Sequence, residues 1–127
     1  MTKQPYITHR SNLQHYAPPG HSGTVNVRLV DKVYTGTFEM IHGTIEPNCE
    51  AHRHSHKTET QVCYVLEGEM EISLGDDPPV KCAPGTIVAI PPELEHHIVS
   101  SGQVPLKLIV IYSPPLPPRD DVLIHKS

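Results

Sequence analysis

Histidines are concentrated in one short stretch of the chain, His52-Arg53-His54-Ser55-His56. On an extended chain, residues two apart point to the same side and lie about 6.5–7 Å apart along the strand. Side chains that lean together can therefore bring two imidazoles to one ion, at metal–nitrogen distances of about 2.0–2.2 Å. The spacing of His54 and His56 predicts one half of a metal site.

Two further side chains can complete this site. Gln61 follows His56 by five residues, at the start of a β-like run that can return it to the same point as part of a hairpin. His96 follows Pro91-Pro92-Glu93 much later in the chain and can reach the same cavity from another strand. The expected metal ligands are His54, His56, Gln61 and His96.

Short strands are the elements that would position these residues. Fourteen prolines disfavour long helices, and no segment keeps an apolar stripe of helical period beyond about two turns. We expect strands over 25–30, 36–45, 61–66, 70–74, 80–82, 86–90, 97–100 and 106–111, with 86–90 buried. Strands of this number and length, separated by turns, predict an all-β fold, an antiparallel jelly-roll β-barrel with few or no helices.

The same residues resemble the two sequence motifs of the cupin superfamily, and the resemblance spans about residues 36–112. The first motif is His, any residue, His, three or four residues, Glu, six residues and Gly, and the second places a His after a Gly and a Pro. The matching residues are His54, His56, Gln61 and Gly68 in the first motif, and Gly85, Pro91, His96 and Ser100 in the second. The resemblance implies a small single-domain cupin with an RmlC-like jelly roll.

The chain departs from the cupin motifs where Gln61 replaces Glu, Glu93 replaces Gly and Ser100 replaces Asn. A Gln ligand brings a neutral carbonyl oxygen, so three His and one Gln leave a divalent ion its full charge. This favours Lewis-acid chemistry over redox chemistry. A His-His-Gln-His set is similar to that of cupins of the pectin-degradation (uronate ring-opening) and polyketide-cyclase types, which implies non-redox rearrangement of an oxygen-rich small molecule.

Three functions are compatible with this interpretation. The first is an enzyme that uses one divalent ion per chain (Zn, Ni, Mn or Fe) as a Lewis acid on a small oxygenated substrate: an isomerase, ring-opening enzyme, cyclase or lyase. The second is a non-haem iron dioxygenase with three His ligands, in which Gln61 only hydrogen-bonds nearby. The third is a non-catalytic small-molecule binding or sensor cupin.

Two side chains are candidates for catalytic acid–base work. His42 shares a strand face with Phe38 and Met40, so it enters the cavity if that face lines the barrel. Glu59 lies in the loop between two expected ligands and would act as a base if it reaches the cavity.

Three other positions leave alternatives open. His52 has the strand parity of His54 and would replace it if a bulge shifts the register. His21 could reach over the barrel mouth. Cys63 shares the parity of Gln61, which predicts a buried and inert thiol.

Length and composition limit the organisation and the partners. The 127 residues suit one domain; we expect an N-terminal arm over 1–23, a cupin domain over 24–113 and a Pro-rich C-terminal tail over 114–127. A formal charge of −4 and apolar runs no longer than Leu108–Tyr112 argue against nucleic-acid and membrane partners. We expect a cytoplasmic homodimer with reduced cysteines, in which 25–30 adds to the partner's sheet edge.

Overall fold

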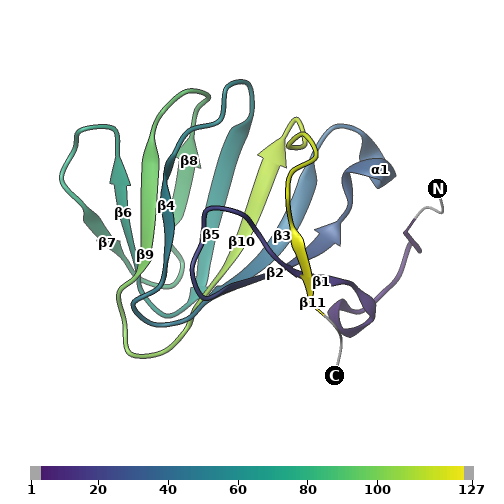
Figure 1. Cartoon of the computed structure of the whole chain (residues 1–127), viewed down its shortest axis with the longest axis horizontal. Coiled ribbons are helices and arrows are strands. Elements are labelled where there is room, and N and C mark those ends of the chain that lie inside the picture. Colours follow the sequence, from purple (N-terminus) through teal and green to yellow (C-terminus); the bar gives the residue numbers. More distant parts are fainter. Residues whose placement is uncertain (1–3, 125–127) are drawn as a thin grey trace.

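The computed structural model of the chain describes residues 4–124 and contains two antiparallel β-sheets (Figure 1). The larger sheet has the order β11-β1-β2-β3-β10-β5-β8 and the smaller sheet has the order β4-β9-β6-β7. The strands are β1 His15–Ala17, β2 Thr24–Val30, β3 Glu39–Ile45, β4 Glu50–His54, β5 Thr60–Glu67, β6 Met70–Leu74, β7 Val80–Cys82, β8 Ile87–Ile90, β9 His96–Ser100, β10 Leu106–Ser113 and β11 Val122–Ile124. The predicted all-β jelly-roll class is confirmed.

Helix is limited to short turns in the described residues, namely the 3-10 turn η1 (Arg10–Asn12) and α1 (Lys32–Thr35). Asp31 caps the start of α1 and Gly36 ends it at φ 76°. The strand expected over 36–45 therefore begins only at Glu39. No helix between residues 4 and 124 combines the length and apolar character needed to cross a membrane.

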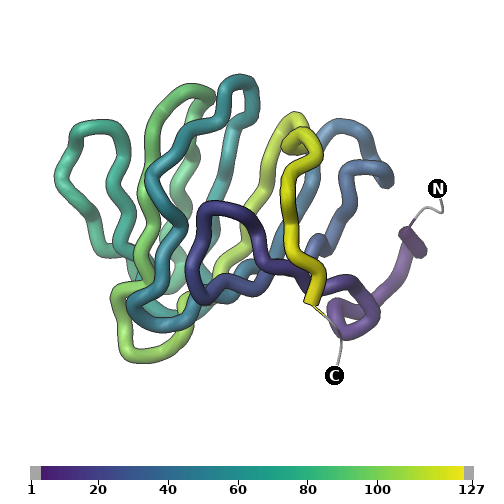
Figure 2. The backbone as a smooth tube through the Cα atoms, in the orientation of Figure 1, coloured from purple at the N-terminus to yellow at the C-terminus, as the bar shows by residue number. Residues whose placement is uncertain are grey.

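One hydrophobic core fills the space between the two sheets. Alternate residues of β3 and β10 are buried, so each strand turns one face to the core. Ile41 and Leu108 of the larger sheet belong to the same core as Ile72 and Ile98 of the smaller sheet. Figure 2 shows the smaller sheet toward one end of the molecule and the paired terminal strands β1 and β11 toward the other.

Strand β8 corrects the expectation of a buried strand over 86–90. It pairs only with β5 and forms an edge of the larger sheet, where Ile87 is 66% exposed and Ile90 is buried. Its apolar residues reflect β propensity at a sheet edge as much as burial.

The terminal segments are more ordered than the arm and tail expected over 1–23 and 114–127. Strand β1 pairs with β2 and β11, and its Tyr16 is 1% exposed, so this part of the arm belongs to the core sheet. In the C-terminal segment Leu116 is buried, and Asp121 accepts a 2.7 Å hydrogen bond from Arg28. The division at 24 and 113 stays a prediction, and residues 1–3 and 125–127 lie outside the described part.

The proposed route to a homodimer does not fit the sheet order. Strand β2 is hydrogen-bonded on both sides within the chain, to β1 and to β3. On the β1 side this pairing covers Asn26 and Val27, so residues 25–30 do not form a continuous free edge for a partner's sheet. The homodimer itself stays a prediction.

Gly68 provides the first testable prediction, because the turn from β5 to β6 needs it. Its φ is 80°, and a Cβ there would lie 2.6 Å from the carbonyl oxygen of Pro105 and 2.9 Å from the Cα of Leu106. Since both atoms are backbone, Gly68→Ala should lower the free energy of unfolding by about 3 kcal/mol, measured by urea denaturation. The matched control is Gly36→Ala, where φ is 76° and nothing lies within 4 Å, with a loss of about 1 kcal/mol. Equal losses in the free energy of unfolding for the two variants would contradict the predicted clash at Gly68.

Candidate metal centre

Three histidines converge from the smaller sheet and the loop beside it. His54 ends β4, His56 follows in the loop before β5, and His96 begins β9. Strands β4 and β9 are paired, and His54 lies opposite His96 in this pairing. The ring centroids of these two histidines therefore lie 4.3 Å apart. The ring of His56 lies 4.9 Å from that of His54 and 5.3 Å from that of His96.

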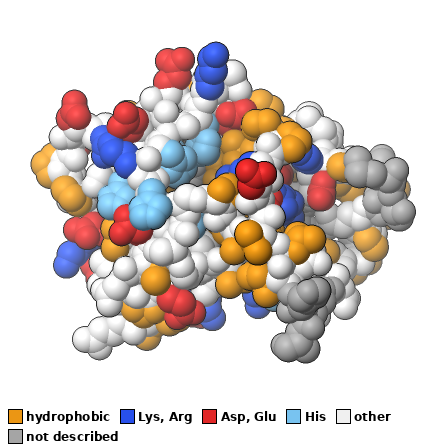
Figure 3. All heavy atoms as spheres, viewed as in Figure 1, with side chains coloured by type: hydrophobic (Ala, Val, Ile, Leu, Met, Phe, Trp, Pro, Cys, Tyr) orange, Lys and Arg blue, Asp and Glu red, His pale blue; other side chains and the backbone are white. Residues whose placement is uncertain are grey.

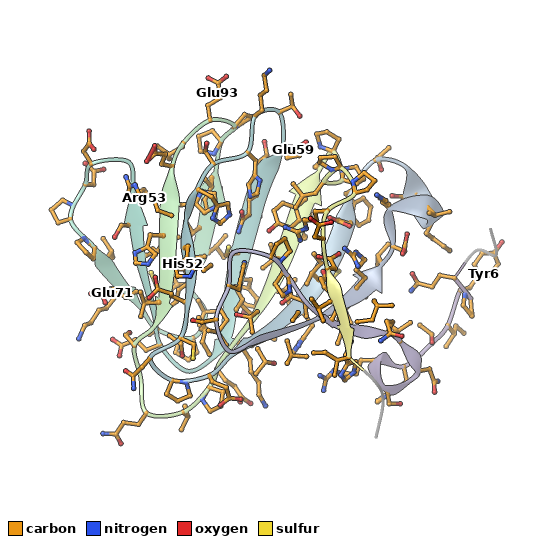
Figure 4. The ribbon with its side chains drawn as sticks, in the orientation of Figure 1. Tyr6, His52, Arg53, Glu59, Glu71 and Glu93 are labelled. Atoms are coloured by element: carbon orange, nitrogen blue, oxygen red, sulfur yellow. The ribbon has the colours of Figure 1, made fainter. Side chains whose placement is uncertain are left out.

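A bulge in β4 decides which histidine faces inward. Ala51 pairs with Ile98 and His54 pairs with His96, so three steps along β4 match two along β9. Two consecutive residues, His52 and Arg53, consequently point outward, as Figure 4 shows on β4. The alternative in which His52 replaces His54 is thus wrong, since the bulge turns His54 inward.

The three imidazoles fit a metal ion. One ring nitrogen from each lies within 4.8 Å of the other two. The Nδ1 of His54 lies 2.6 Å from the carbonyl oxygen of His52, and the Nδ1 of His96 lies 3.0 Å from that of Leu94. If each Nδ1 donates its proton there, each Nε2 keeps a free lone pair. The Nε2 of His96 is buried and has no hydrogen-bond partner among the described residues, which is costly unless a ligand satisfies it.

Gln61 lies beside these histidines at the start of β5. Its Oε1 is 3.1 Å from the Nε2 of His56, and its amide nitrogen donates to the Sγ of Cys63 at 3.4 Å. The structure thus brings the four predicted ligands together, and direct ligation by Gln61 stays a prediction. The interior position of Cys63 is confirmed, and burial raises the pKa of its thiol to about 11.

His54 and Gln61 border a cavity of about 30 Å³ between the two sheets, and the rings of His56 and His96 lie next to that of His54. A space of this size holds about two water-sized groups. Burial lowers the pKa of His96 to about 4, and burial also lowers the pKa of His56. Both rings are therefore neutral at pH 7, which is the form that binds metals.

Three residues of the cavity wall carry polar side chains beyond the predicted ligands, namely His21, Asn26 and Tyr112. His21 has its ring centroid 6.5 Å from that of His54, and its Nδ1 lies 3.2 Å from the Oγ1 of Thr24. Tyr112, near the end of β10, has its ring centroid 5.2 Å from that of His56. The sequence indicated His21 as a residue that could reach over the barrel mouth, and it did not single out Tyr112.

His42 does not reach the cavity, which corrects the expectation that its face lines the barrel. The buried face of β3 carries Glu39 and Ile41, one residue out of step with His42. The register places His42 beside Val27 and Ile109, on the face turned away from the smaller sheet. Its predicted catalytic role has no support from this position.

Glu59 is buried near the start of β5, outside the ligand cavity (Figure 4). Although burial raises its pKa, hydrogen bonds from the hydroxyl and N–H of Thr58 hold the pKa of Glu59 below its usual value. It borders a surface hollow together with His56 and Arg119. Its catalytic role stays a prediction.

Comparison with known proteins gives a family and a fold. Residues 41–112, more than half of the chain, match the Cupin_2 family of cupin domains. An uncharacterised protein of Methanocaldococcus jannaschii is 29% identical over 98 residues, which cover 76% of this chain and 78% of the relative.

Two solved structures resemble the whole fold. The polyketide cyclase RemF from Streptomyces resistomycificus has a TM-score of 0.77 at 23% identity, covering 98% of this chain and 88% of that one. A predicted oxalate decarboxylase from Thermotoga maritima has a TM-score of 0.74 at 17% identity, covering 84% and 97%. At these identities the likeness concerns the fold alone.

The metal centre makes a prediction that isothermal titration calorimetry can check. Chelator-treated protein without a His tag should bind about one equivalent of Zn²⁺ or Ni²⁺ per chain. His54→Ala and His96→Ala should each weaken that binding at least ~100-fold, because each removes one imidazole ligand. The matched control is His97→Ala, since His97 neighbours His96 on β9 but bonds outward to Glu50 at 2.9 Å. Parent-like binding by His54→Ala would contradict the assignment.

The stability of the chelator-treated protein should depend on pH through His21 and His96. Burial lowers the pKa of each from 6.5 to about 4. Between these values the unfolded chain binds more protons than the folded chain, so the free energy of unfolding falls as pH drops from 6.5 to 4. The slope is at most ~1.4 kcal/mol per pH unit for each histidine.

Urea denaturation at several pH values measures this dependence. His21→Gln should flatten the slope, whereas His9→Gln, at an exposed position, should leave it unchanged. A free energy of unfolding that stays constant over this range would contradict the burial of both rings.

Proposed function

The chain belongs to the cupin family, and we propose that it is a metal-dependent enzyme that rearranges or cleaves a small oxygenated organic molecule without redox chemistry. The reaction class would be isomerisation, ring opening, cyclisation or a lyase step. One observation carries the proposal: three histidines cluster beside a neutral Gln61, at the edge of the cavity that His54 and Gln61 line. The likeness in fold to a polyketide cyclase and to a predicted oxalate decarboxylase supports it.

The charge of the predicted ligand set favours this chemistry. Three imidazoles and one amide are all neutral, and no described Asp or Glu joins the histidine cluster. When bound, a divalent ion would keep its full charge there and would supply polarisation of a substrate carbonyl or hydroxyl. A carboxylate in the place of Gln61 would reduce that polarising power.

The protein's own side chains would orient the substrate. Burial raises the pKa of Tyr112, so its phenol stays protonated and can donate a hydrogen bond to a substrate oxygen. His21 lies across the cavity wall, and because burial lowers its pKa to about 4, its ring is neutral at pH 7 and can accept a hydrogen bond from a substrate hydroxyl. We infer that these two residues, rather than His42, hydrogen-bond to the substrate in this cavity.

A non-haem iron dioxygenase is the second candidate. The contact between Gln61 and His56 favours it, because the Oε1 of Gln61 could accept from the Nε2 of His56 and stay outside the site while His56 binds the ion through its Nδ1. A non-catalytic binding or sensor domain is the third, and it would use the same cavity without turnover.

Assays of the metal-loaded protein separate these functions. With Zn²⁺, Ni²⁺ or Mn²⁺, we expect turnover of one member of a panel of hydroxy acids, oxo acids and polyketide-like phenols, followed by NMR, without oxygen uptake. Gln61→Glu should keep the ion but lower kcat/KM by about 10–100-fold, because it adds a negative charge beside the ion. The matched control His97→Ala should change kcat/KM less than about threefold.

Other outcomes would contradict the proposal. Turnover only with iron and with oxygen consumption would favour the dioxygenase. Tight binding of a small molecule without turnover, for every metal tried, would favour the sensor domain.

A further inference from the structure

The C-terminal segment that joins β10 to β11 lies at the mouth of the metal centre. It is fixed by buried Leu116 at one end and by the pairing of β11 with β1 at the other. Two surface hollows flank the histidine cluster, one bordered by His21 and His54 and the other by His56 and Glu59. Figure 3 shows histidine side chains gathered on this face, with basic side chains close to them.

Arg119 is the residue common to both hollows. Its guanidinium carbon lies 5.9 Å from the ring centroid of Tyr112, and that ring in turn contacts His56. The side chain thus stands where the two hollows meet, beside the predicted ligands. A molecule seated in either hollow is therefore bordered by Arg119.

The hydrogen-bonding capacity of Arg119 is not consumed by its acidic neighbour. Its Nε is buried and lies 3.6 Å from the Oδ1 of Asp121, which is close enough for an ion pair but too long for a hydrogen bond. An anion would therefore be bound by the two Nη groups. The other oxygen of Asp121 accepts a 2.7 Å bond from Arg28. Asp121 is therefore held mainly by Arg28, and it anchors the segment while leaving Arg119 able to bind an anion.

The surroundings of Arg119 favour a negatively charged group. His52 and Arg53 line the same hollow, where His52 is paired with Glu50 at 3.0 Å and Arg53 with Glu95 at 2.7 Å. Among the described residues that line the two hollows, Glu59 supplies the carboxylate, and Thr58 hydrogen-bonds to both of its oxygens. A guanidinium matches a carboxylate because two parallel N–H groups can donate to its two oxygens.

We propose that Arg119 binds the carboxylate of the substrate, so that the substrate is a small carboxylic acid with a hydroxyl or carbonyl oxygen near the acid group. This inference rests on the proposed function of the same site. The substrate's second oxygen would face the predicted ligands while its carboxylate meets Arg119. Arg119 thereby selects acids over their neutral analogues.

The test compares acids with their amides on the Zn²⁺-loaded protein. Lactate with lactamide, and mandelate with mandelamide, are titrated while the histidine ring protons are followed by NMR. We expect Arg119→Gln to weaken acid binding at least ~10-fold and to change amide binding less than about twofold, because only the acid can form the charged pair. Arg119→Lys should recover part of the acid affinity.

Asp121→Asn is the matched control, because it loosens the anchor of the segment but leaves the guanidinium in place. Parent-like preference for the acids in Asp121→Asn supports the proposal. If Arg119→Gln weakens the binding of acids and amides equally, and Asp121→Asn does the same, Arg119 has only a structural role. That result would overturn the proposal. Failure of the parent to prefer either acid over its amide would overturn it as well.

Zn²⁺ binding measured on the same samples separates this proposal from the proposed function. Failure of the parent protein to bind Zn²⁺ would contradict the metal centre itself. Normal Zn²⁺ binding without an Arg119-dependent preference for acids would contradict only the carboxylate site.

Discussion

The bulged pairing of β4 with β9 is the constraint on which the site depends. It places His54 opposite His96 and turns His52 and Arg53 outward. Without the extra residue, the alternation along β4 would send His54 to the surface. The smaller sheet also packs its inner face on the larger one, so the histidines open into a space closed by β3 and β10.

Charge neutrality of the ligand set links this geometry to the proposed chemistry. Buried imidazoles with lowered pKa values are neutral at physiological pH and are ready to bind an ion. Gln61 adds an oxygen without adding charge, so an ion there would be a strong Lewis acid. The same lack of negative charge makes the mouth favourable for an acidic substrate, which is where Arg119 stands.

The sequence predicted the ligand motifs and most of the short strands, but it did not predict the contacts between segments that lie far apart in the chain. Its motifs located all four residues that the structure brings together, because their spacing follows the cupin pattern, whereas strand parity alone would not reveal the bulge that turns His54 inward. From the sequence, His42 was considered to face the cavity because it shares a strand face with the apolar Phe38 and Met40. The opposite face of β3, which carries Glu39, is the buried one, and Arg28 lies 3.4 Å from the carboxylate of Glu39. The positions of His21 and Arg119 depend on contacts between distant segments, which no local pattern records.

X-ray absorption at the metal edge of the loaded protein tests the central claim most directly. The account predicts three imidazole nitrogens at about 2.0–2.1 Å, with the remaining ligands oxygen. His96→Ala should reduce the imidazole count to two, while His97→Ala should leave it at three. One imidazole or none in the parent spectrum, or a spectrum unchanged by His96→Ala, would contradict the assignment of His54, His56 and His96 as the metal ligands.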